Sequence, residues 1–117
     1  MKILYLEDNR QEAALVTRYM QTTAHEFLLA LTLDEARQAV AAQPEIVLVD
    51  LVLGHTRDGY HFIRELRNQG YAQPIVAVTG LTAPRDLQEC RAIGAYAVLV
   101  KPFTINQLAE VIHQYAS

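Results

Sequence analysis

The sequence contains very little cysteine: Cys90 is the only one in 117 residues. A single cysteine cannot form an internal disulfide, and it cannot supply the several thiolates of a cysteine zinc cluster. Cys90 falls within a helix-like segment, and a free cysteine usually behaves as a small buried apolar residue. We therefore predict that Cys90 is part of the core.

The sequence also lacks a long hydrophobic segment. The apolar run at its start, MKILYL, is followed at once by Glu7 and Asp8, which is too early for a secretory signal peptide. No other stretch approaches the roughly 20 apolar residues that a transmembrane helix needs. These absences predict a cytoplasmic protein with no membrane partner.

An excess of basic residues is absent as well. The 10 Lys and Arg residues are outnumbered by 13 Asp and Glu residues, which gives a net charge of −3 and argues against direct nucleic-acid binding. No repeat, low-complexity tract or Pro/Gly/Ser-rich linker divides the chain. With 51% hydrophobic residues, the sequence can build a core without disulfides or a structural metal. We expect one domain over residues 1–117.

Short apolar runs alternate with longer amphipathic segments. Four runs are nearly continuous and rich in Val and Ile, as is typical of strands buried on both faces: Ile3–Leu6, Ile46–Val49, Ile75–Val78 and Ala97–Val100. A fifth run, Phe27–Ala30, is ambiguous between strand and helix because of its two central leucines, and its length favours a strand.

The intervening segments have helical features. Thr32 and Glu35 match a capping box, and the helix that they open must end before Pro44. The other predicted helices are Gln11 to about Met20, Gly59 to Asn68 with Gly70 as its stop, Pro84 to Ile93, and a last helix capped by Thr104.

This alternation predicts an α/β fold of the (βα)5 type, with a doubly wound, parallel five-stranded sheet covered by helices on both sides. Five strands favour the flavodoxin-like order 2-1-3-4-5. Sites in such sheets form at the carboxyl ends of the strands, where the strand order reverses. The residues just after Leu6 and Val49 are therefore the first candidates for a site.

Polar residues follow four of the five predicted strands: Glu7-Asp8, Asp50, Thr79-Gly80 and Lys101-Pro102. Each has an ordinary explanation when taken alone, since Asp8 could cap the next helix and Lys101 could be solvated. Their conjunction at one rim of the sheet is harder to explain without a site.

Three carboxylates in one crevice repel one another, and a divalent cation relieves that repulsion. Oxygen ligands favour Mg²⁺ over zinc, which prefers Cys and His. Glu7, Asp8 and Asp50 bring three negative charges, and Mg²⁺ with Lys101 would balance them. The four histidines are scattered and are not predicted to bind metal: His25, His55, His61 and His113.

From Met1 to Ser117 the chain resembles the receiver domains of bacterial response regulators. The resemblance rests on five elements: the Glu7-Asp8 pair, Asp50 after the run IVLV, Asp58-Gly59, Thr79-Gly80 and Lys101-Pro102-Phe103. It implies a phosphoacceptor signalling domain of a two-component or phosphorelay system. Such a domain is not an enzyme acting on other substrates, because it catalyses only its own phosphorylation and dephosphorylation.

The resemblance also implies individual roles. Asp50 would be the phosphoacceptor, and Mg²⁺ would be bound by Asp8, Asp50 and the backbone carbonyl of Val52, with Glu7 acting largely through water. Lys101 would pair with Asp50 and then with the phosphoryl oxygens. The two remaining assignments are a hydrogen bond from Thr79 to the phosphoryl group and a cis peptide before Pro102.

Further implications concern partners. A sensor histidine kinase or a histidine phosphotransfer protein would supply the phosphoryl group. A downstream effector would bind the face made by the helix over residues 84–93, the strand over residues 97–100 and the last helix. A second copy of the chain, in a homodimer, is a further candidate partner.

The sequence departs from the family pattern in three places. Gly54 replaces a proline, in a loop that is one residue longer than the common form. Val98 occupies the position of a switching aromatic residue, and Tyr96 is a candidate partial substitute. The positions that would steer a hydrolytic water are the apolar Val52 and Leu81, which predicts a long-lived phosphorylated state.

Two alternative functions are open at this point. One is a pseudo-receiver that acts as a constitutive protein-interaction domain, which Val98 and the altered loop favour slightly. The other is a nucleotide- or flavin-dependent enzyme on the same scaffold. Against the enzyme, no glycine-rich phosphate loop follows the first strand, because the segment from Glu7 to Arg10 is acidic where a phosphate would bind.

Overall fold

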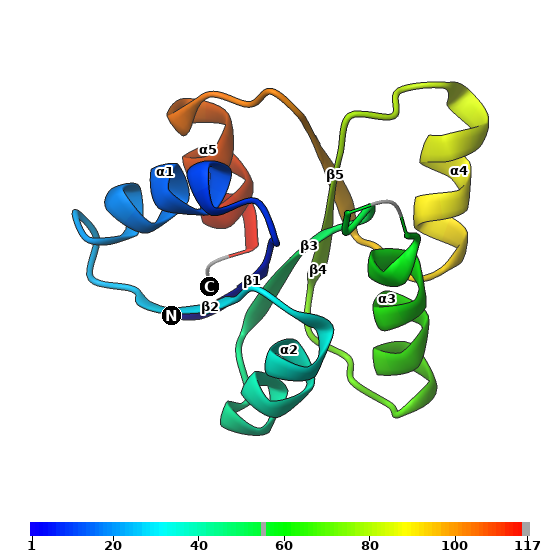
Figure 1. The fold of residues 1–117 in the computed structure, drawn as a ribbon, viewed down its shortest axis with the longest axis horizontal. Helices are drawn as coiled ribbons and strands as arrows, with labels where there is room; N and C mark the ends of the chain where they lie inside the picture. The colour runs from blue at the N-terminus through cyan, green and yellow to red at the C-terminus, as the bar shows by residue number, and fades with distance from the viewer. Residues whose placement is uncertain (55, 116–117) are drawn as a thin grey trace.

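The computed structural model describes residues 1–54 and 56–115. Five strands alternate with five α-helices, and a short 3₁₀ helix follows the second of them (Figure 1). The elements are β1 (Lys2–Leu6), α1 (Arg10–Met20), β2 (Glu26–Ala30), α2 (Leu33–Ala39), η1 (Val40–Ala42), β3 (Ile46–Asp50), α3 (Asp58–Asn68), β4 (Ile75–Thr79), α4 (Pro84–Ala92), β5 (Ala97–Val100) and α5 (Ile105–Tyr115). No helix of the described residues is both long and apolar enough to cross a membrane.

The sheet has the predicted order, β2-β1-β3-β4-β5, and every neighbouring pair is parallel. This confirms the doubly wound, flavodoxin-like fold class. α1 and α5 cover one face of the sheet, and α2, α3 and α4 cover the other (Figure 1). The ambiguous run at Phe27–Ala30 is a strand, β2, at the edge of the sheet.

The sheet separates two hydrophobic clusters. Alternate residues of β3 contribute to opposite clusters: Ile46 and Leu48 face α1 and α5, while Val47 and Val49 face α2, α3 and α4. All five residues of β3 are buried, as expected for a central strand covered on both sides. Cys90 of α4 is fully buried in the second of these clusters, which confirms its packing role.

Side-chain caps fix the starts of three helices. The Thr32 hydroxyl accepts a hydrogen bond from the Glu35 amide at 3.1 Å, as the capping-box motif predicts. Thr104 and Gln107 form a reciprocal pair at the start of α5. At α1 the cap is Asn9, whose side chain accepts from two backbone amides, so the interpretation of Asp8 as a helix cap is wrong.

The second helix ends before Pro44, as predicted. α2 ends at Ala39, and the chain tightens into the 3₁₀ turn Val40–Ala42 before Pro44. Gln43 then adopts a left-handed conformation with φ of 58°, which reverses the chain toward β3. The predicted bounds of the other helices agree with the structure to within one or two residues.

Candidate functional site

The pleat of the sheet brings three charged residues to one side of the carboxyl ends. Glu7 follows β1, Asp50 ends β3 and Lys101 follows β5. By the two-residue period of a strand, each continues the row of buried side chains that faces α1 and α5. The rows are Ile3 and Tyr5, Ile46 and Leu48, and Ala97 and Leu99. In-register pairing of β1 with β3, and of β3 with β4, aligns the strand ends beside one another.

Lys101 is the centre of this group. Its Nζ lies 2.7 Å from Glu7 Oε1, 2.9 Å from Asp50 Oδ2 and 2.7 Å from Glu12 Oε2. The lysine side chain is 19% exposed, and those of Glu7 and Asp50 are 0% and 7% exposed. The structure thus brings together Glu7, Asp50 and Lys101, which the sequence analysis selected, and adds a carboxylate that it did not select.

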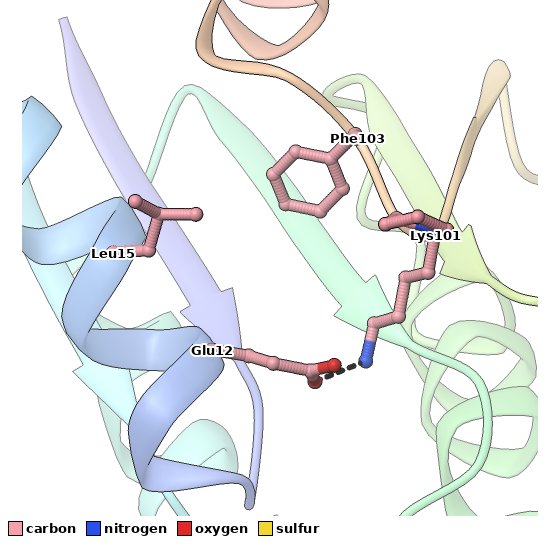
Figure 2. Close-up of a pocket in the computed structure, with 5 residues that line it drawn as sticks. Glu12, Leu15, Lys101 and Phe103 are labelled. Carbon is pink, nitrogen blue, oxygen red and sulfur yellow. Dashed lines mark hydrogen bonds and ion pairs between the residues drawn. The ribbon is translucent and has the colours of Figure 1, made fainter.

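Glu12 is the residue that sequence reasoning missed. It lies in the first turn of α1 and points across the crevice to Lys101 (Figure 2). A signal exists in the sequence, because Glu12, Val16 and Met20 recur at intervals of four and so share one face of α1. Val16 and Met20 are buried against the sheet, and Glu12 continues their stripe past the carboxyl ends of the strands.

Glu7 is a fully buried carboxylate with fixed partners. Its oxygens accept hydrogen bonds from the Tyr5 hydroxyl at 3.2 Å and from the Asn9 amide at 3.3 Å. Burial, and after it the neighbouring Asp50 carboxylate, raises the pKa of Glu7 above its usual value. The same burial, with Glu7 nearby, raises the pKa of Tyr5, which keeps that hydroxyl a hydrogen-bond donor.

Lys101 and Glu12 have shifted pKa values too. Burial acts to lower the pKa of Lys101, but hydrogen bonds with Glu12, Glu7 and Asp50 outweigh it and raise that pKa. The neighbouring Glu7 carboxylate, and then burial, raise the pKa of Glu12. Burial and the grouping of several carboxylates around one ammonium group together account for these directions.

Asp8 completes an acidic pocket over the carboxyl ends of the strands. This pocket is lined by Glu7, Asp8, Asn9, Glu12, Asp50, Val52, Gly54 and Lys101. Ligand oxygens of Glu7, Asp8 and Asp50 all lie within 4.8 Å of one another. Four carboxylates face one ammonium group here, so three negative charges are unbalanced. The oxygen-only donor set and this excess charge fit a hard divalent cation such as Mg²⁺.

The loop after β3 places Val52 at the pocket. The Val52 amide donates to Asp50 Oδ1 at 3.3 Å, and the Val52 side chain is 39% exposed. Gly54 has φ of +61°, which explains the missing proline, because proline is restricted to φ near −65°. Leu53 and Thr56 pair through two backbone hydrogen bonds, while His55 lies outside the described residues.

Thr79 lies at the end of β4, beside the lysine loop. Its backbone carbonyl accepts from the Lys101 amide at 2.8 Å, and its buried hydroxyl accepts from the Leu81 amide at 3.0 Å. The hydroxyl therefore orders the turn after β4 in this structure. Leu81, like Val52, presents an apolar side chain that is about two-fifths exposed, at 40%.

Tyr96 is not placed to act as the missing switch aromatic. It precedes β5, and its hydroxyl donates to the Ala72 carbonyl in the loop before β4, at the end of the sheet opposite the pocket. Arg67 lies over its ring, 5.0 Å from the centroid, and Tyr115 packs beside it. Val98 is half-buried and packs on the cluster beneath α2, α3 and α4. The peptide bond between Lys101 and Pro102 is cis, as the resemblance implies.

Comparisons with known proteins agree with this geometry. The family model for the response regulator receiver domain matches residues 3–113. Among curated relatives, the transcriptional regulatory protein BasR of Escherichia coli is 30% identical over 109 residues, covering 92% of this chain and 49% of BasR. A probable C4-dicarboxylate response regulator, DctR of Halalkalibacterium halodurans, is 33% identical over 73 residues, which are 62% of this chain and 31% of DctR.

The chain spans less than half the length of these two relatives. Among solved structures, the chemotaxis protein CheY4 of Vibrio cholerae superposes with a TM-score of 0.89 at 26% identity, and 98% of each chain is covered. The family model, the curated relatives and the shared fold agree on one classification. This chain belongs to the response regulator receiver domains, the phosphoacceptor domains of two-component signalling.

Proposed function

We propose that Asp50 accepts the phosphoryl group in this domain, with Lys101 and Thr79 as its supporting residues. One observation carries the proposal: Lys101 Nζ lies 2.9 Å from Asp50 Oδ2 inside the acidic pocket. A carboxylate oxygen of Asp50 would attack the phosphorus atom, and the bond from phosphorus to the donor would break. Positioning and charge neutralisation account for most of the catalysis in such a transfer.

The pocket would hold Mg²⁺ through Asp8, Asp50 and the backbone carbonyl of Val52, with Glu7 contributing through water. The oxygen cluster and its excess negative charge support this assignment. When bound, the ion supplies positive charge against the negative oxygens of the incoming phosphoryl group. The chain's own contribution is to fix Asp50 by the Val52 amide and to keep Lys101 against it.

The donor would be the phosphohistidine of a sensor kinase or of a histidine phosphotransfer protein. In that transfer the phosphorus–nitrogen bond breaks, and the histidine keeps the electron pair while a phosphorus–oxygen bond forms at Asp50. Lys101 would hydrogen-bond the phosphoryl oxygens. The Thr79 hydroxyl, which accepts from the Leu81 amide in this structure, still has its own O–H and would donate it to the phosphoryl group.

The output would pass through the face made by α4, β5 and α5. Thr79 and Lys101 support this, since both lie at strand ends that lead into those helices, and their backbones are bonded to each other. Exposed residues of the predicted face are candidates to meet an effector or a second copy of the chain: Arg85, Gln88, Arg91, Tyr96, Gln107 and Glu110.

The pseudo-receiver alternative gains no support from the site. Desolvating a lysine and two carboxylates is costly, and a constitutive interaction domain would gain no function from holding these charges together. Here Glu7, Asp50 and Lys101 are retained in contact, and Asp8 completes the acidic pocket.

The direct test is a mass measurement. The protein is incubated with phosphoramidate or acetyl phosphate and Mg²⁺, and its intact mass is followed in wild type and in Asp50→Asn. We expect one phosphoryl adduct in wild type and none in the variant. An adduct that persists in Asp50→Asn at the wild-type level would overturn the assignment.

A further inference from the structure

The ammonium group of Lys101 has no free hydrogen. A lysine has three N–H donors, and the structure gives Lys101 three carboxylate acceptors: Glu7 at 2.7 Å, Glu12 at 2.7 Å and Asp50 at 2.9 Å. The proposed function requires Lys101 to bind phosphoryl oxygens as well. It cannot do so until one of these three partners is released.

The three partners differ in how easily they can leave. Glu7 is 0% exposed and is also held by the Tyr5 hydroxyl and the Asn9 amide. Asp50 is 7% exposed and is itself the proposed acceptor. Glu12 is 46% exposed, and within the described residues its carboxylate accepts a hydrogen bond from Lys101 alone.

The Glu12 side chain borders solvent. It reaches Lys101 from α1 across the crevice, with Leu15 and Phe103 to one side of the contact (Figure 2). The Glu12 carboxylate is 46% exposed, so water solvates it once it separates, while Lys101 keeps its contacts with Glu7 and Asp50. Glu12 can therefore turn into solvent at small cost, whereas Glu7 cannot.

We infer that Glu12 is a positioning residue that acts as a placeholder for the phosphoryl group. Its carboxylate occupies the third N–H of Lys101 in the resting domain, and a phosphoryl oxygen takes that N–H when it arrives. This inference rests on the proposed function of the site. Its consequence is that Glu12 opposes phosphorylation by competing for the same donor, while its negative charge favours the cation.

The test measures binding of beryllofluoride and of Mg²⁺, because the inference predicts opposite changes in the two affinities. In Glu12→Gln, half-saturation by beryllofluoride at saturating Mg²⁺ should occur at about two- to fivefold lower concentration, the size expected for one exposed ion pair. Half-saturation by Mg²⁺ alone should shift to about twofold higher concentration. A variant that merely loosened α1 would bind both ligands more weakly, and that outcome would overturn the inference.

Two further variants separate contact from charge. Glu12→Asp keeps the charge but shortens the side chain, so it should bind beryllofluoride as Glu12→Gln does. If Glu12→Asp binds beryllofluoride as wild type does, the effect depends on the negative charge alone and not on the contact with Lys101. That result would contradict the placeholder role of Glu12. Asp34→Asn, an equal change of charge on the exposed start of α2, should leave both half-saturations unchanged.

Failure of the inference and failure of the proposed function look different. If the domain is not a phosphoacceptor at Asp50, wild type and Asp50→Asn will respond alike to beryllofluoride. If only the placeholder is wrong, wild type will bind beryllofluoride, Asp50→Asn will not, and Glu12→Gln will bind it no more tightly than wild type.

Discussion

Gly59 of α3 packs directly against the backbone of Asp50. A Cβ atom added to Gly59 would lie 2.0 Å from the carbonyl oxygen of Asp50 and 2.5 Å from the Cα of Leu51. The first turn of α3 thus lies on the end of β3, and only glycine allows this approach. In the Asp58-Gly59 motif that opens α3, the glycine is therefore required by packing.

The first prediction concerns this contact. Gly59→Ala should lower the free energy of unfolding by about 1–3 kcal/mol, because the obstructing atoms belong to the backbone and cannot rotate away. Denaturant unfolding measures it. Gly80→Ala is the matched control, since nothing lies within 4 Å of its added Cβ. Equal stability of the two variants would contradict the argument.

The second prediction is a pH dependence in metal-free protein. The folded-state pKa of Glu7 is raised by burial and then by Asp50, so its contribution to stability is present below its ordinary value of 4.5 and is lost as pH rises through the folded pKa. Between that value and neutral pH, wild type should lose stability relative to Glu7→Gln. The difference between the two proteins cancels the opposite contribution of His25, whose pKa is lowered by burial.

Thermal unfolding in the presence of a chelator, at several pH values, checks this expectation. Glu7→Gln removes the titrating group and keeps the shape of the side chain, so that its Oε1 can still accept from Tyr5. A constant difference in melting temperature across the range would mean that Glu7 titrates normally in the folded protein.

The third prediction concerns the cation. Asp8 is exposed at the rim of the acidic pocket, so Asp8→Asn should leave the fold intact while abolishing phosphorylation by small donors. Without metal its melting temperature should equal or exceed that of wild type, because one of the repelling carboxylates is removed. Binding of Mg²⁺ alone to wild type should be weak, since this ion keeps several waters. Normal phosphorylation of Asp8→Asn would contradict the metal assignment.

The fourth prediction is a long-lived phosphorylated state. Val52 and Leu81 flank the site with exposed apolar side chains that cannot orient an attacking water. Restoring polar groups in Val52→Asn/Leu81→Glu should speed loss of the phosphoryl group by about tenfold for each position, or about 1.4 kcal/mol in the barrier. The rate is followed by intact mass after removal of the donor. No acceleration in the double variant would mean that the two residues only pack against their loops.

The fifth prediction concerns the output face. Amide exchange with and without beryllofluoride should change around Thr79 to Ile93, because the Thr79 hydroxyl, which orders the turn through the Leu81 amide, would turn its O–H toward the ligand. Changes confined to α2 and α3 would place the output elsewhere. The same experiment should report on a second connection between the site and α4. Arg57, in the loop after β3, pairs with Glu89 of α4 and stacks on Tyr60 at 3.9 Å.

Most of the fold could be predicted because buried parallel strands leave continuous apolar runs. The run from Ile46 to Val49 is of this kind, and the polar residue that follows it, Asp50, marks the edge where the site lies. The helix caps predicted at Thr32 and Thr104 are local signals, and in the structure each hydroxyl accepts from a backbone amide of the helix that it caps. The edge strand β2 was harder to assign because burial on its two sides is incomplete.

The part that could not be predicted depends on contacts between elements. A glutamate in the first turn of a helix is well explained by the helix dipole, so Glu12 alone gives no reason to look further. Only the strand order, the pleat and the face of α1 together place it over Lys101. The bond from the Leu81 amide to the Thr79 hydroxyl is likewise a property of one turn's geometry.

The alternation within β3 sets a rule for how the length of this domain can vary. Ile46, Leu48 and Asp50 lie on one side of the sheet, and Val47 and Val49 lie on the other. Inserting one residue within the strand would reverse every later side chain, turning Asp50 away from Lys101 and a valine into its place. Insertions should therefore be tolerated in the loop after Val52, outside the strand, and eliminated between Ile46 and Asp50.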